Sequence, residues 1–270
     1  MRLPAGLRVP LTVITVLVLV FIYVPLLLVL INSFNVDRTF TWPPPGYTTH
    51  WWKLAWESEG ARDALWTSVR VAIAATVIAL LLGTLAAMGL RRTRFFGRNV
   101  VSLLIILPIA LPGIVTGLAL QNGFRTILGI PLSLWTVIIA HATFCIVTVF
   151  NNVQARFARL GANFEQASMD LGAGPFTTFR LITLPMLRSA LLAGALLSFG
   201  LSFDEIVVTQ FTASSTDQTL PIWIFQNLFR PNQAPIVNCV AAALVVFSAI
   251  PIYLAQRLSG NASEAMTGAR

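Results

Sequence analysis

Two adjacent carboxylates, Asp204 and Glu205, lie within the apolar run SALLAGALLSFGLSFDEIVVTQF at residues 189–211. If this run crosses a membrane as one helix, a rise of about 1.5 Å per residue places the pair roughly 22–24 Å from residue 189, in the outer part of the bilayer. Charges at that depth are costly unless they face a cavity or a partner, so the pair is predicted to be functional. Carboxylates attract ammonium groups and repel phosphate or sulfate, which predicts a cationic solute.

A stripe of polar residues extends the acidic pair along one helix face. Its members recur at intervals of four, three, four and three, as Ser198, Ser202, Glu205, Thr209 and Thr212. We therefore predict that Glu205 faces a solute pathway and that Asp204, about 100° round the helix, points to one side of it. The alternative is a helix that ends near Phe203 and leaves both acids in the headgroup region, although the apolar residues 206–211 favour continued burial.

A second stretch, EQASMDLGAGPFTTFRLITLP at residues 165–185, has helical periodicity but is too polar to cross a membrane. Phe164, Ala167 and Leu171 share one apolar helix face. The sequence GAGP at residues 172–175 then indicates that one helix ends and another begins. Two short helices joined by a turn are predicted, either docked on a partner or lying on the membrane surface.

The elements that position these residues are predicted to be membrane helices. The chain is 56% hydrophobic and 10% charged, with a mean hydropathy of +0.79, which excludes a single soluble core. The predicted fold class is all-α, a polytopic membrane protein with six transmembrane helices, because six runs approach the roughly 20 residues that cross roughly 30 Å of hydrocarbon. These runs are residues 9–31, 66–90, 100–121, 132–152, 189–211 and 236–258.

The predicted organisation has three parts. Residues 1–64 hold the first helix and an outer aromatic loop, residues 65–260 a core of the other five spans with the polar segment at 160–188, and residues 261–270 a cytoplasmic tail. The first apolar run is too long for a signal-peptide core and lacks a small-x-small cleavage pattern, so we expect it to be retained. The outer loop contains Trp42, Tyr47, Trp51, Trp52 and Trp56. An interfacial aromatic belt is favoured over direct solute binding, and a docking surface for an extracytoplasmic partner fits equally well.

The third apolar run, LLIILPIALPGIVTGLAL, contains four helix-breaking residues within ten positions: Pro108, Pro112, Gly113 and Gly117. This density predicts an irregular segment that is buried in protein or lines a water-filled cavity. A kinked packing helix, whose glycines allow close helix contact, fits the same sequence.

Basic residues predict the orientation. With the N-terminus inside, twelve of the eighteen basic residues fall on inner segments, among them the cluster RRTRFFGR at 91–98 between two spans. Both termini and residues 165–185 are therefore predicted to be cytoplasmic. Because the basic residues form short clusters beside apolar runs, we interpret the net charge of +8 as an orientation signal and not as a phosphate-binding surface. Membrane lipid and not nucleic acid is therefore the expected partner.

Several functions find no support in the sequence. His50, His141, Cys145 and Cys239 have no metal-ligand spacing, so no metal site is predicted. No G-x-x-x-x-G-K-[ST] motif occurs, and the only lysine is Lys53 in the outer loop, so ATP hydrolysis by the P-loop mechanism is excluded. A membrane enzyme ranks last, because no nucleophile and base are visible. An ion-coupled secondary transporter that uses the acidic pair remains an alternative, although the internal repeat expected of one is not seen.

One segment resembles a known family. Gly172, followed after nine residues by ITLP at 182–185, matches the glycine and I-x-L-P parts of the E-A-A signature of permease subunits of bacterial ATP-binding-cassette importers. MDLGAGPFTTFRLITLP, LSFGLSFDEIVVTQF, PIALPGIVTGLAL and TLPIWIFQNLF are similar to the spermidine/putrescine-type branch, and the resemblance covers roughly residues 65–258. The E-A-A triplet itself departs from the signature, because Gln166, Ala167 and Ser168 occupy it and the acid lies one residue earlier, at Glu165.

The resemblance implies a type I importer permease fold with cytoplasmic coupling helices between spans four and five, within residues 160–188. It carries the contact with the ATPase over to Glu165, Gln166, Ala167, Asp170, Gly172, Ile182, Leu184 and Pro185. It also implies a second permease subunit, two ATP-binding subunits that hold ATP and Mg²⁺, and an extracytoplasmic solute-binding protein. The chain would then be a multi-pass subunit of the bacterial cytoplasmic membrane without a cofactor or enzymatic activity of its own. Its solute would be a small cation, a polyamine such as spermidine or putrescine, with a different solute as the alternative.

Overall fold

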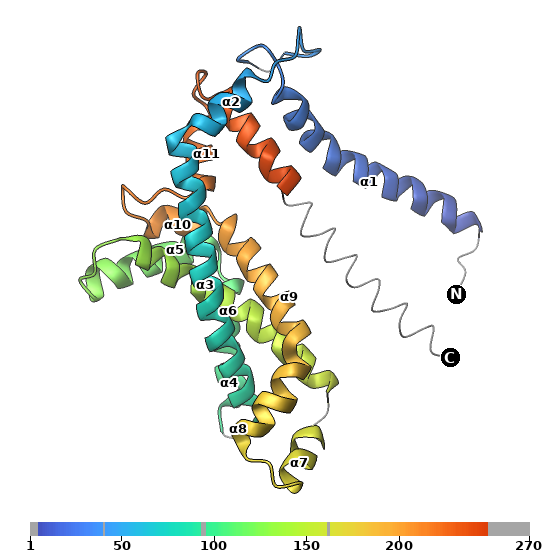
Figure 1. Ribbon diagram of the computed structural model, residues 1–270, viewed down its shortest axis with the longest axis vertical. Coiled ribbons are helices and arrows are strands. Elements are labelled where there is room, and N and C mark those ends of the chain that lie inside the picture. The colour runs from blue at the N-terminus through green and yellow to red at the C-terminus, as the bar shows by residue number, and fades with distance from the viewer. Residues whose placement is uncertain (1–4, 40, 93–95, 161–162, 248–270) are drawn as a thin grey trace. The chain divides into compact units, whose positions relative to one another are not determined.

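The computed structural model describes residues 5–39, 41–92, 96–160 and 163–247 (Figure 1). Within these residues nearly every regular element is a helix, and the only β-pairing is an isolated bridge between Asn35 and Tyr47. The predicted all-α class is confirmed. The chain divides into two compact units, of which one combines residues 1–62 with 224–270 and the other spans residues 63–223.

Four of the predicted spans are helices that are long and apolar enough to cross a membrane. They comprise α1 (Ala5–Asn32), α3 (Glu59–Arg92), α6 (Leu134–Arg159) and a helical stretch that ends with α9 (Leu184–Phe203). For the sixth run, a shorter apolar helix covers Ala234–Phe247, and residues 248–258 lie outside the described residues.

The unit of residues 1–62 and 224–270 holds α1 and the aromatic loop that follows it. None of the most apolar 18-residue window of α1 is buried, as expected of a helix surrounded by hydrocarbon. In the loop, α2 (His50–Glu57) is held by Trp51, whose indole Nε1 donates to the Asn35 carbonyl at 2.9 Å. Trp42 and Trp56 are exposed, so aromatic surface is available to lipid or to a partner, and the choice between them stays a prediction.

The helix α6 forms the core of residues 63–223 (Figure 1). It begins with a capping box, in which Ser133 and Thr136 exchange side-chain and backbone hydrogen bonds. Val149 on α6 lies between two glycines of neighbouring helices. A Cβ on Gly83 of α3 would lie 3.0 Å from the Val149 Cβ, and one on Gly194 of α9 would lie 3.4 Å from the Val149 Cα. Small residues therefore let α3 and α9 pack directly on α6.

The third predicted span is a pair of helices, α4 (Arg98–Ala110) and α5 (Gly113–Asn122), followed by a π-helical turn, η1 (Gly123–Ile127). The two arms are bent by 105°. Leu111 and Pro112 are extended at the bend, because a residue before proline disfavours the helical region. The predicted break in this run is confirmed, whereas its burial in protein or contact with a water-filled cavity stays a prediction.

Candidate functional site

The acidic pair lies at a break between two helices. The helix α9 ends at Phe203, residues 204–206 are not helical, and α10 (Val207–Thr212) begins after them. The prediction of one continuous helix over 189–211 is therefore wrong, and the alternative end near Phe203 is what the structure has. The Glu205 carboxylate contributes to the break, because its Oε1 accepts the Val208 N–H at 2.8 Å, an amide that has no partner within α10.

The two carboxylates differ in their surroundings. Asp204 is exposed, and among the described residues its carboxylate contacts no hydrogen-bond donor. Glu205 is half-buried. Its Oε1 accepts a hydrogen bond from the Val208 N–H, and its backbone carbonyl accepts one from the Thr209 hydroxyl at 2.8 Å. The Asp204 carboxylate is therefore accessible to a ligand, while that of Glu205 is held in a fixed position beside it.

The hydroxyl stripe faces α6. The side chains of Ser198, Ser202, Thr209 and Thr212 are each at most 3% exposed. Ser198 donates to the Cys145 carbonyl at 3.3 Å, and the Thr136 hydroxyl donates to the Thr212 carbonyl at 2.7 Å. These contacts make the stripe a helix–helix interface in this chain, and contact of Ser198, Ser202 and Thr209 with solute stays a prediction.

Sequence reasoning missed His141, which is fully buried on α6. Its Nδ1 lies 2.8 Å from the Ser202 hydroxyl and its Nε2 lies 2.8 Å from the Thr209 hydroxyl. The sequence offered no local signal for this cluster, because the two partners lie 61 and 68 residues further along the chain.

The helix α5 packs on α10, which brings the two helix breaks together (Figure 1). A Cβ on Gly117 would lie 2.6 Å from the Phe211 Cδ2, and one on Gly113 would lie 3.4 Å from the Val207 Cγ1. The glycines of α5 thus allow the close helix contact that was the alternative interpretation of this run, in addition to the bend.

The predicted pair of short helices is present in the polar segment. The helix α7 (Asn163–Asp170) is followed by a turn, then by α8 (Pro175–Thr178) and a π-helical turn, η2 (Phe179–Thr183). Gly172 has φ of 85°, a left-handed conformation that favours glycine. The Gly172 N–H donates to the Met169 carbonyl and the Ala173 N–H to the Ser168 carbonyl, which is the Schellman pattern of a helix end.

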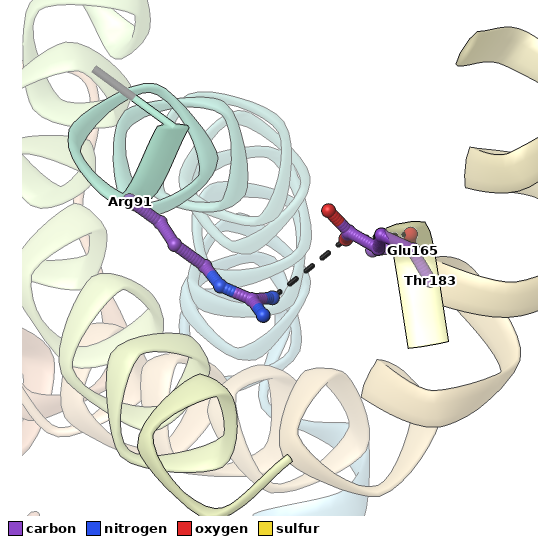
Figure 2. Close-up of polar contacts among 3 residues, drawn as sticks. All are labelled: Arg91, Glu165 and Thr183. Atoms are coloured by element: carbon purple, nitrogen blue, oxygen red, sulfur yellow. Dashed lines mark hydrogen bonds and ion pairs between the residues drawn. The ribbon is translucent and has the colours of Figure 1, made fainter. Parts of the chain in front are cut away.

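Glu165 faces inward and connects three elements (Figure 2). Its Oε1 lies 3.6 Å from Nη1 of Arg91 at the end of α3 and accepts the Thr183 hydroxyl at 2.9 Å. The Arg91 guanidinium also lies over the Phe157 ring of α6, 4.3 Å from its centroid. Only 16% of the Glu165 side chain is exposed. Within this chain, Glu165 therefore holds α7 against α3 and η2, a role for Arg91 and Thr183 that sequence reasoning missed.

The polar segment exposes large apolar side chains as well as polar ones. Six large apolar side chains are exposed between residues 164 and 184: Phe164, Met169, Leu171, Phe176, Leu181 and Leu184. Among the residues predicted to contact an ATPase, the exposed ones are Gln166, Ala167, Asp170, Gly172, Leu184 and Pro185, and Ile182 is half-buried. Several large apolar side chains exposed within one short segment are a feature of interaction sites.

Comparison with known proteins gives consistent matches. The family described as "Binding-protein-dependent transport system inner membrane component" matches residues 79–261. The spermidine/putrescine transport system permease protein PotC of Escherichia coli (strain K12) is 32% identical over 249 residues, which cover 92% of this chain and 93% of that protein. The putrescine transport system permease protein PotI of the same strain is 34% identical over 259 residues, covering 93% and 91%.

Two further matches are a relative named for a different solute and a solved structure with lower sequence identity. The putative 2-aminoethylphosphonate transport system permease protein PhnV of Salmonella typhimurium is 31% identical over 245 residues, covering 90% of each chain. The crystal structure of a bacterial ABC transporter involved in the import of the acidic polysaccharide alginate contains a chain with the same fold. The TM-score is 0.69 at 15% identity, over 97% of this chain and 99% of that one.

Proposed function

Because the chain belongs to the family of inner-membrane components of binding-protein-dependent transport systems, we propose that it forms half of the pathway of an ATP-driven polyamine importer. It is a multi-pass permease subunit of an ABC importer, and its family sets aside both a membrane enzyme and an ion-coupled secondary transporter. Partners that bind ATP and solute follow from the family. The proposed assembly contains a second permease, two ATP-binding subunits and one extracytoplasmic solute-binding protein, with both termini of this chain in the cytoplasm.

The observation that carries the proposed solute class is the exposed Asp204 carboxylate beside the fixed Glu205 carboxylate at the α9–α10 break. Two carboxylates with no cation within hydrogen-bond distance among the described residues would bind an ammonium group by charge-assisted hydrogen bonds. The solutes in the names of PotC, PotI and PhnV all carry an amine, which supports the same chemistry.

The proposed ATPase contact is the apolar surface of α7 and α8. Leu171 and Phe176 are 89% and 74% exposed there, on a hairpin whose turn is fixed by Gly172. In this proposal, Glu165 acts indirectly, by holding α7 in place through Arg91 and Thr183. The helix α9 begins directly after this segment and ends at the acidic break, so it links the ATPase contact to the pathway.

The proposal is tested by removing charge at constant shape. The reconstituted complex with Asp204→Asn and Glu205→Gln should lose radiolabelled putrescine and spermidine uptake by at least about tenfold, since each charge-assisted hydrogen bond contributes about 1.5–3 kcal/mol. Asp63→Asn, which removes one exposed carboxylate at the start of α3, is the matched control and should transport normally. Unchanged polyamine uptake in the double variant would reject the cation pathway.

A further inference from the structure

His141 connects the two helical arms on either side of the acidic break. Ser202 lies in the last turn of α9 and Thr209 in α10, and one imidazole ring lies 2.8 Å from each hydroxyl. All three side chains are at most 3% exposed. The His141 side chain of α6 therefore connects the end of α9 to α10 across residues 204–206, which are not helical.

Each nitrogen of the His141 ring has a buried hydroxyl as its partner. A neutral imidazole carries one N–H, so one ring nitrogen donates and the other accepts, and each hydroxyl takes the complementary role. The position therefore requires one donor and one acceptor held a fixed distance apart, which an apolar side chain of similar size does not supply.

The same network determines where the Glu205 carboxylate lies. Its Oε1 accepts the Val208 N–H of α10, and its carbonyl accepts the Thr209 hydroxyl that His141 holds. The other end of α10 is held to α6 as well, because the Thr136 hydroxyl donates to the Thr212 carbonyl. Glu205 is therefore placed by α10, and α10 is placed by α6.

We infer that His141 is a positioning residue for the solute pathway, which holds the Glu205 carboxylate beside Asp204 through Thr209 and α10. This role rests on the proposed function of the acidic pair. It gives α6 a part in solute recognition, although no residue of α6 carries a charge near the break.

The experiment measures polyamine uptake per ATP hydrolysed in vesicles that contain the complete importer. His141→Leu should lower this ratio about tenfold, because it leaves the Ser202 and Thr209 hydroxyls without their buried partner. His141→Gln, which offers one donor and one acceptor, should restore the ratio to within about twofold. Thr209→Val removes the same bridge from the other side and should reproduce the loss if His141→Leu does not assemble. Cys145→Ala, one turn along α6 in the same buried interface, is the control and should retain the ratio of the unmodified protein.

A double-mutant cycle separates positioning from a merely structural role. In a Glu205→Gln background, His141→Leu should cause less than about a twofold further loss, because residues that act through one group are not additive. Equal fold losses in both backgrounds, or a His141→Leu ratio equal to that of the unmodified protein, would overturn the role of His141 alone. Normal uptake by Glu205→Gln itself would overturn the proposed pathway, and the inference with it.

Discussion

The α9–α10 break and the α7–α8 segment have opposite distributions of polar and apolar side chains. At the break, His141, Ser202 and Thr209 are buried and bonded to one another. On the α7–α8 segment, Leu171 and Phe176 are large, apolar and exposed. A buried network whose hydrogen bonds are all satisfied holds one geometry. Exposed apolar side chains stabilise a complex only when a partner covers them. The two regions lie at opposite ends of α9, so one helix joins the buried network to the segment with exposed apolar side chains (Figure 1).

The largest effect on binding of the ATP-binding subunit is expected from charges placed on the proposed ATPase contact of the α7–α8 segment. Leu171→Asp with Phe176→Asp should weaken binding of the ATP-binding subunit by at least about 100-fold, because central interface side chains contribute about 2 kcal/mol or more each. The permease itself should fold normally, because both side chains are exposed. Co-purification and solute-stimulated ATP hydrolysis measure the loss, with Leu171→Met and Phe176→Leu as the apolar control. Normal co-purification of the aspartate variant would mean that this surface does not contact the ATP-binding subunit. The proposed difference between the two regions would then be wrong.

Added volume tests the rigidity of the break region. A Cβ on Gly117 would lie 2.6 Å from the Phe211 Cδ2, whereas one on Gly123 would have no atom within 4 Å. Overpacking costs about 1–3 kcal/mol, so Gly117→Val should lower the thermal unfolding midpoint of the purified protein by several degrees. Gly123→Val provides the control for the same change without a clash. Equal midpoints for the two variants would mean that α10 yields to α5 and that the break is not rigid.

The two helix breaks also differ in how far the sequence predicted them. Pro112 restricts the residue before it and lacks an N–H, so the bend between α4 and α5 follows from local chemistry. Residues 204–206 contain neither proline nor glycine. The spacing of Ser202 and Thr209 on either side of them fits an unbroken helix, so the sequence gives no sign of the break. The buried hydrogen bonds that accompany this break join Ser202 and Thr209 to His141 of another helix, and no short window of sequence contains these partners.

The α7–α8 segment shows the same division between local and distant information. Gly172 predicted the turn, because its conformation is a property of the residue itself. The hydrophobic periodicity of Phe164, Ala167 and Leu171 predicted a helix with one apolar face. The inward orientation of Glu165 depends on Arg91, which lies 74 residues earlier, at the end of a different helix. Sequence periodicity therefore located both regions, and tertiary contacts decided which of their side chains are free for a ligand or a partner.

The smallest effect on binding of the ATP-binding subunit is expected from the change Glu→Gln, made in each of the two regions. Gln at position 165 keeps an acceptor for the Thr183 hydroxyl and loses the ion pair with Arg91, which is partly exposed. Such pairs contribute about 0–1 kcal/mol, so Glu165→Gln should weaken binding of the ATP-binding subunit less than about fivefold. The difference should shrink at high salt, because screening weakens the pair in the unmodified protein.

Binding of the ATP-binding subunit, measured at low and high salt for Glu165→Gln and Glu205→Gln together, completes the comparison. Glu205→Gln should leave this binding unchanged at both salt concentrations, since its carboxylate lies at the far end of α9. A large, salt-sensitive loss for Glu165→Gln would mean that Glu165 contacts a cation of the partner directly. Glu165 would then bind a partner directly, as the two acids at the break are proposed to bind the solute. The two regions would then not differ in how their carboxylates act.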